Sequence, residues 1–350
     1  MIAWPVVSRS GLFAVALSLA AVPASAELVL PPGFGVHVYV SGDGFEASSR
    51  SGVRGVASTS TLAFDDSGAL YLGRSGRRYT GGEVEDLWPL YRVPLGGARL
   101  TPATEAQYFY GPPLHNAQVA AVRAGRELFV TTFDRDRKVG VLYRVRGGRA
   151  ELFAGGTPAG GEAPLLVQPE GAAVDETGNV YVADRARGAV VKLDPMGRLL
   201  DPRYITVARP RLIASGEGGH LWIGSDGTAE APWHRGIGEI VKVDAGRVLT
   251  VVLRGPLVAS MVVSPSGHLF VADRQAARIF FLDSEGKPVE FASFTDGDAP
   301  RSLCFAPITP ETRRAGIAGD LFVVTVNRGA WQVNEVLRIA GPFDAHLRGR

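Results

Sequence analysis

The chain contains six copies of one short pattern: a glycine, a variable residue, Leu or Val, an aromatic residue and an aliphatic residue. The copies occupy residues 68–72, 126–130, 178–182, 219–223, 267–271 and 319–323, and in the second copy Arg126 replaces the glycine. Their aromatic residues recur about every 40 to 60 positions, the spacing of four-stranded blades that follow one another around an axis. The repeat therefore favours one architecture. By itself it indicates no chemistry.

Further strands are predicted around each copy. A short apolar strand precedes it, at 61–64, 119–122, 171–174, 212–214, 261–263 and 303–305. A third strand follows it, at 90–93, 142–145, 190–193, 240–243, 279–282 and 336–339. Most third strands carry Lys or Arg one residue before their last aliphatic residue, and we expect these charges to be solvated. An outer fourth strand is predicted at 150–153, 248–252 and 289–291.

One alternating segment, 35–40, precedes the first blade, whereas little chain follows the last one. A ring leaves no free sheet edge if this first strand becomes the outer strand of the final blade. We therefore predict an all-β fold, a six-bladed β-propeller closed by the N-terminal strand, with residues 27–350 as a single domain.

The first 26 residues have the features of a secretory signal peptide. Arg9 precedes an apolar run at 11–22, and Ala24-Ser25-Ala26 is a small-x-small cleavage site. The run is too short to span a bilayer as a helix of about 20 residues, and no later segment is a spanning candidate. We expect a periplasmic or secreted protein with no membrane span after cleavage. The alternative is an uncleaved N-terminal anchor.

The charge balance argues against nucleic acid as a partner. The chain has 37 Lys and Arg against 35 Asp and Glu, a net charge of +2, which creates no strong field of one sign. The 44 Gly and 23 Pro are typical of a turn-rich globular protein. The one cysteine, Cys304, lies in an apolar strand and is interpreted as a buried, unreactive thiol. We expect a monomer.

Residues 168–197 resemble an NHL repeat. The family pattern is Pro-x-Gly, an apolar strand, Asp-x-x-Gly-Asn, a second strand ending in Ala-Asp, and a third strand ending at a glycine turn. Residues 168–197 follow it, and residues 261–286 are similar. The resemblance implies the six-bladed fold of TolB-like propellers and of the senescence-marker and gluconolactonase propellers. It leaves function open, because NHL-type propellers include lyases, lactonase relatives and non-catalytic binding scaffolds.

A candidate site follows from the propeller prediction. The inner strands line the axis, and the residue four positions before the end of each strand is expected at one mouth. These residues are Ser60, Gln118, Glu170, Ala259 and Arg301, with Pro210 or Arg211 in the fourth blade. Glu170 with Arg211 and Arg301 could bind a small polar ligand or a carboxylate. Alternatively, these groups satisfy one another and buried waters.

No metal site is predicted. The gluconolactonase relatives hold a divalent cation by Glu, Asn and Asp from different blades, and here only Glu170 is in a matching position. Asn116 comes two residues too early, and no Asp occurs in the ring. Amidating lyases with similar propellers use three His on zinc. Of the six His here, only His115 and His234 are in irregular segments near a mouth.

No cofactor is predicted either. Residues 30–34 resemble the first segment of soluble sugar dehydrogenases that use pyrroloquinoline quinone. The segment after His115 lacks the glycines of that family.

Three segments, 74–88, 108–116 and 225–238, are predicted to be irregular. They carry aromatic and Arg residues, which binding surfaces favour, and we expect Trp233 and His234 to contact a ligand. Packing of these segments over the blades is the alternative. The pairs Asp184-Arg185 and Asp273-Arg274 are interpreted as turn-capping residues and not as catalytic acids.

Two functions remain open at this point. The first is a binding or scaffold module that recognises a protein, a glycan or a small ligand through its loop-bearing face. The alternative is a lactonase- or lyase-type enzyme, with Glu170 and His115 in acid–base roles and with Arg211 and Arg301 holding an anionic substrate.

Overall fold

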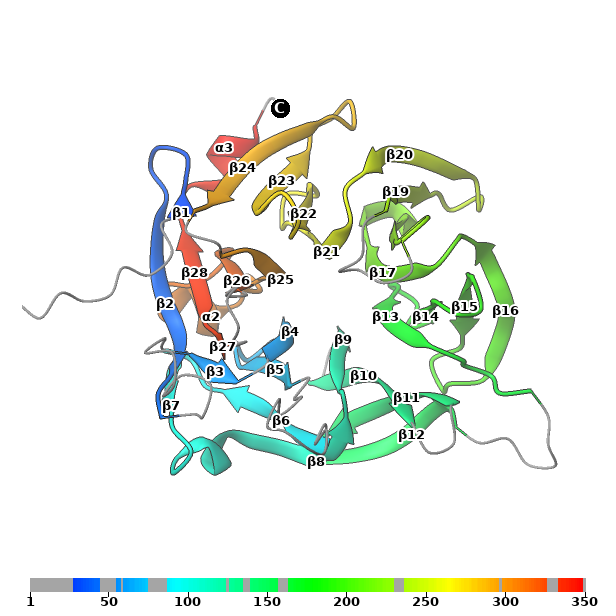
Figure 1. Ribbon diagram of the computed structural model, residues 1–350, viewed down its shortest axis with the longest axis horizontal. Helices are drawn as coiled ribbons and strands as arrows, with labels where there is room; N and C mark the ends of the chain where they lie inside the picture. The colour runs from blue at the N-terminus through cyan, green and yellow to red at the C-terminus, as the bar shows by residue number, and fades with distance from the viewer. Residues whose placement is uncertain are drawn as a thin grey trace, which may run out of the picture.

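The computed structural model describes residues 28–44, 55–57, 59–74, 87–123, 126–134, 139–156, 163–229, 236–295, 298–325 and 333–348. These residues form six antiparallel blades arranged around one axis, so the predicted all-β propeller is confirmed (Figure 1). None of the described helices is long and apolar enough to cross a membrane.

Each blade has four strands that follow the chain from the axis outwards, except that the last blade takes its outer strand from the N-terminus. Blade 1 consists of β4 (Thr59–Phe64), β5 (Leu70–Arg74), β6 (Leu87–Val93) and β8 (Phe109–His115); blade 2 of β9 (Gln118–Arg123), β10 (Glu127–Asp134), β11 (Val139–Arg146) and β12 (Arg149–Gly155); blade 3 of β13 (Pro169–Val174), β14 (Val180–Asp184), β15 (Ala189–Leu193) and β16 (Leu199–Thr206). Blade 4 consists of β17 (Pro210–Ser215), β18 (Leu221–Ser225), β19 (Gly238–Val243) and β20 (Leu249–Gly255); blade 5 of β21 (Val258–Val263), β22 (Leu269–Asp273), β23 (Arg278–Leu282) and β24 (Pro288–Phe294); blade 6 of β25 (Pro300–Phe305), β26 (Leu321–Thr325), β28 (Val336–Ala340) and β2 (Gly35–Gly42).

The ring is closed by the N-terminal strand, as predicted. β2 pairs antiparallel with β28, the strand nearest the C-terminus. Two further pairings extend the closure. β1 (Leu28–Val29) adds a fifth strand to blade 5 through β24, and β7 (Ala98–Leu100) pairs in parallel with β2. The first strands of the chain therefore join blades 5 and 6, and β7 ties blade 1 to them.

The remaining elements are short. β3 (Val56–Ala57) pairs with β27 (Val333–Asn334). Two 3-10 turns, η1 (Glu105–Tyr108) and η3 (Glu217–Gly219), lie in blades 1 and 4. The helix α2 (Pro310–Arg314) fills the long hairpin of blade 6, and α3 (Phe343–Leu347) follows β28.

The hairpins between first and second strands explain the repeat. In blade 3, Asp175 accepts backbone hydrogen bonds from Thr177 and Asn179 at 2.9 Å each, and the hydroxyl of Tyr181 donates to it at 3.0 Å. Gly178 has a φ of 84°, a left-handed conformation that glycine adopts without strain. The glycine therefore closes the turn, and the aromatic residue anchors it.

Basic residues of the third strands differ from our expectation of solvated charges. Tyr181 pairs across the strands with Lys192, and Trp222 pairs with Lys242. Each ammonium lies over its ring, at 5.2 Å and 5.3 Å from the centroid. These side chains are half-buried, because an aliphatic stem packs on an aromatic ring while the charge faces its electron-rich surface.

The segment 109–115 also differs from its prediction. It is the outer strand of blade 1, β8, and not an irregular segment. The partly buried Cys304 agrees with its interpretation as an unreactive thiol, since burial raises the pKa of its sulfhydryl to about 12.

Replacing Tyr39 by alanine should lower the free energy of unfolding by about 3 kcal/mol or more. Its ring is 8% exposed and packs edge-on against Phe322 of blade 6 at 4.8 Å. Its hydroxyl accepts a hydrogen bond from the Gly96 backbone at 3.2 Å. Chemical denaturation measures the loss, with Val38→Ala as a control on the same strand because Val38 is 48% exposed. Equal losses in the two variants would contradict the closing role of Tyr39.

Candidate functional site

The predicted ring residues coincide with an irregularity that recurs in the inner strands. In five blades the pairing register between first and second strands shifts at one residue near the start of the inner strand. These residues are Ser60, Glu170, Arg211, Ala259 and Arg301. In blade 2 the shift falls between Val119 and Ala121, just after Gln118. A bulge redirects the side chain of the extra residue, and bulges are common at the rims of barrels and beside active sites.

Blades 2 and 3 meet at Glu170. The side-chain amide of Gln118 donates to one carboxylate oxygen at 3.1 Å, and that of Gln168 donates to the other at 2.9 Å. The hydroxyl of Thr131 donates to the backbone oxygen of Glu170 at 2.6 Å. Among the described residues these two amides are the hydrogen-bond partners of the carboxylate, which is thus held from two blades.

Arg211 forms the second part of the site, in blade 4. Its Nε donates to Asp226 at 2.8 Å, and a terminal nitrogen donates to the backbone oxygen of Val258 in blade 5. Arg185 from blade 3 binds the other oxygen of Asp226 at 2.9 Å. Asp226 is 1% exposed, so a buried carboxylate joins two guanidinium groups across the interface between blades 3 and 4.

Burial dominates the electrostatics of Glu170. It raises the pKa of the carboxyl above its ordinary value, because a low-dielectric surrounding disfavours the charged form. The positive charge of Arg211 and the two amide donors oppose this effect only in part, and Arg185 adds a smaller opposing contribution. A carboxyl with a raised pKa can accept a proton from a ligand or share one with it.

The other predicted site residues occupy the following positions. The hydroxyl of Ser60 donates within its own blade, to the backbone oxygen of Gly73 at 3.2 Å. Arg301 occupies the bulge position of blade 6. His115 ends the outer strand β8, and its backbone oxygen accepts a hydrogen bond from the Thr132 hydroxyl. His115 does not donate to Glu170, whose partners are the two amides. Trp233 and His234 lie outside the described residues.

Sequence reasoning missed three members of this cluster, Gln168, Arg185 and Asp226. Gln168 precedes the NHL proline and was visible in the motif. Arg185 follows Asp184, whose carboxylate accepts from the Val167 and Gln168 backbones at 2.7 and 2.9 Å. Asp184 also accepts from the Arg187 backbone in the following turn at 3.2 Å, so its turn-capping interpretation is confirmed, whereas its neighbour Arg185 reaches the next blade. Within the described residues, no three His, Cys, Asp or Glu are grouped closely enough to hold a metal ion.

Comparisons with known proteins agree with this architecture. Residues 166–193, which comprise β13 to β15, match the family model of the NHL repeat, so the resemblance identified in the sequence is confirmed. No curated protein sequence matches the chain. The fold and the repeat define a six-bladed β-propeller that contains an NHL repeat.

Three solved structures illustrate the shared fold. An auxiliary nutrient binding protein from Bacteroides ovatus ATCC 8483 is 13% identical, with a TM-score of 0.55 over 89% of this chain and 77% of that chain. A gluconolactonase from Xanthomonas campestris is 14% identical, with a TM-score of 0.53 over 82% and 88%. A streptogramin B lyase is 10% identical, with a TM-score of 0.51 over 89% and 98%. At such identities the likeness concerns the fold.

The raised pKa of Glu170 predicts a pH-dependent stability difference from Glu170→Gln. The pKa of a Glu side chain in an unfolded chain is about 4.3. The folded wild type holds the proton more tightly, so its stability falls as the pH rises from the unfolded to the folded pKa. Glutamine does not titrate. Melting temperatures between about pH 4 and pH 8 should therefore shift in favour of the variant as the pH rises. A difference that is constant with pH would contradict the prediction.

Proposed function

We propose that the protein is a binding propeller that recognises a small molecule, a glycan or a protein segment at the mouth defined by Gln118, Glu170 and Arg211. The observation that carries this proposal is that the side chains of Glu170 and Arg211 are already held in place by hydrogen bonds. Glu170 accepts from two amides, and Arg211 is bound by Asp226 and by a backbone oxygen. Such side chains are pre-organised for recognition, because little conformational entropy is lost when a ligand binds to them.

The placement of the chain connections supports this mouth as the recognition face. The connections from second to third strands leave from the edge at which the inner strands begin, since Asp184 at the end of β14 pairs with Pro169 at the start of β13. Loops on one edge of a rigid scaffold commonly carry binding residues. Trp233 and His234 fall between β18 and β19 in the sequence, outside the described residues, and are part of the proposal.

A lactonase- or lyase-type enzyme is the second candidate. The raised pKa of the Glu170 carboxyl favours it, because a general base is most effective when its pKa is near the working pH. In this case Arg211 and Arg301 would bind an anionic substrate, with His115 as a further proton carrier. The first candidate is preferred because the hydrogen-bond partners of the Glu170 carboxylate among the described residues are two amides, and neither amide is an acid–base group.

The location and assembly state belong to the proposal as well. We propose that the protein is periplasmic or secreted, on the basis of residues 1–26, and, separately, that it is a monomer. N-terminal sequencing of the exported protein, with Glu27 expected as its first residue, tests the cleavage.

Turnover and binding assays on the same protein separate the two functions. We expect no hydrolysis of glucono-δ-lactone, with or without added Ca²⁺ or Zn²⁺, and binding to a member of a neutral saccharide panel that weakens about tenfold in Gln118→Ala. Glu176→Gln is the matched control, because Glu176 is exposed in the hairpin of the same blade. Lactone hydrolysis that is lost in Glu170→Gln but kept in Glu176→Gln would establish the enzyme instead.

A further inference from the structure

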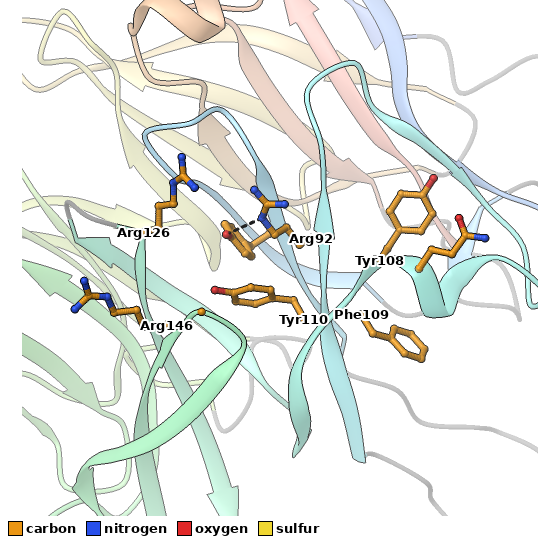
Figure 2. A pocket seen from close by; sticks show the side chains of 9 residues that line it. Arg92, Tyr108, Phe109, Tyr110, Arg126 and Arg146 are labelled. Atoms are coloured by element: carbon orange, nitrogen blue, oxygen red, sulfur yellow. Dashed lines mark hydrogen bonds between the residues drawn. The ribbon is translucent and has the colours of Figure 1, made fainter.

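A second cleft lies between blades 1 and 2, at the edge opposite to Glu170. It opens where hairpins join the first and second strands, and its volume is about 570 Å³. This volume is within the range of small-molecule pockets. Figure 2 shows Arg126 and Arg146, from two turns of blade 2, on one side of the cleft, and Arg92 and Tyr110 of blade 1 opposite them. The cleft shares no residue with the mouth described above.

The lining of the cleft is positively charged. It includes three arginines and, among the described lining residues, no carboxylate. Arg126 and Arg146 are exposed, and neither guanidinium makes a hydrogen bond or ion pair with another described residue.

Neighbouring carboxylates are engaged elsewhere. Glu127 pairs with Arg123, and Glu151 pairs with Arg144 at 2.7 Å. The hydrogen bond from Arg144 is the largest cause of the lowered pKa of the Glu151 carboxyl, and the charge of Arg146 makes only the smallest of the contributions that lower it. The positive charge of the cleft is therefore left available to a ligand.

The backbone conformation of Arg126 also supports a ligand site in this cleft. Its φ is 62°, and the glycines at the same position of the other five hairpins have φ values between 76° and 85°. Glycine is the residue that this conformation favours. Blade 2 instead places an arginine there, and its side chain faces the cleft (Figure 2). Strained positions of this kind concentrate at ligand-binding sites.

Aromatic rings provide the second kind of contact. Tyr110 is partly buried and packs edge-on against Tyr71 at 5.1 Å. Its hydroxyl points toward the side of the cleft that carries Arg126 and Arg146 (Figure 2). Tyr108 and Phe109 also line the cleft, and Phe109 is 39% exposed, but their rings lie on the other side of the chain from Tyr110 (Figure 2). Rings beside guanidinium groups suit a ligand with both a ring and an anionic group.

The equivalent pocket between blades 3 and 4 is an internal comparison. It has the same core, in which Tyr181 packs edge-on against Tyr204 at 5.1 Å beneath Lys192. Its lining also includes the carboxylates of Asp175 and Glu176. The aromatic and basic core thus belongs to the repeat, whereas the excess of positive charge belongs to the cleft between blades 1 and 2.

We propose that this cleft binds a small acidic sugar. The guanidinium groups of Arg126 and Arg146 hold its carboxylate or phosphate, and the ring of Tyr110 supports the sugar. Guanidinium groups bind such anions with two parallel hydrogen bonds, and this geometry also orients the attached ring. The site is independent of the function proposed for the channel mouth.

Calorimetric titration of the whole protein tests the site. The probes are D-glucuronate and D-glucose 6-phosphate, with D-glucose, inorganic phosphate and AMP for comparison. One of the two acidic sugars should bind at least about tenfold more tightly than glucose and inorganic phosphate. The double variant Arg126→Gln, Arg146→Gln should lose about tenfold or more in that affinity. The stronger acidic sugar identifies the anionic group as carboxylate or phosphate.

Arg313→Gln is the matched control, because Arg313 is an exposed arginine on the α2 hairpin of blade 6, and it should bind like the wild type. Tyr110→Leu, checked by its melting temperature, should weaken acidic-sugar binding and leave inorganic phosphate unaffected. A wild type that binds neither acidic sugar would overturn the proposal, and so would a double variant with full affinity. Tighter binding of AMP than of both acidic sugars would overturn the assignment to a sugar.

Discussion

The pairing of β2 with β28 is the interaction on which the rest of the structure depends. Each blade of a propeller buries its faces against two neighbours, so an open array would expose apolar surface at both ends. Here the N-terminal strand completes blade 6. Phe322 of that blade packs against Tyr39 of β2 and against Phe64 of blade 1, each at 4.8 Å. The closure therefore fixes the positions of the inner strands. The hydrogen bond from Gln118 to Glu170 likewise joins the inner strands of two neighbouring blades, 2 and 3.

The sequence predicts the inner strands well because glycine turns and alternating apolar residues are local features. It predicts the outer strands less well. Segment 109–115 contains Gly111, Pro112 and Pro113 and is predicted to be irregular, yet it forms β8. Proline has no amide hydrogen to donate, which is tolerated on an outermost strand because one side of that strand has no partner. β16, which contains Pro202, was missed for the same reason.

The sequence also predicts one part of the candidate site, the bulge residues, and not the other part, their hydrogen-bond partners. Counting back from the strand ends finds the bulge residues, because the repeat fixes where each inner strand begins. The partners of those residues come from other blades, and no local pattern reports them. Arg185 and Asp226 are 41 positions apart. The adjacent residues Asp184 and Arg185 have different partners, since Asp184 accepts from the Val167 backbone and Arg185 donates to Asp226 of the next blade. Contacts of this kind depend on how neighbouring blades pack, so they were found only in the structure.

The two edges of the propeller have opposite electrostatic characters. At the edge that carries Glu170, Arg211 is paired with the buried carboxylate of Asp226, and Glu170 accepts hydrogen bonds from two neutral amides. At the hairpin edge, Arg126 is exposed and adopts a left-handed backbone that costs a residue other than glycine about 1 kcal/mol or more. A glycine would relieve that strain, and five of the six hairpins contain one. The positive charge proposed for the cleft would account for an arginine at this position, although Arg209 and Arg247 also adopt positive φ outside the cleft.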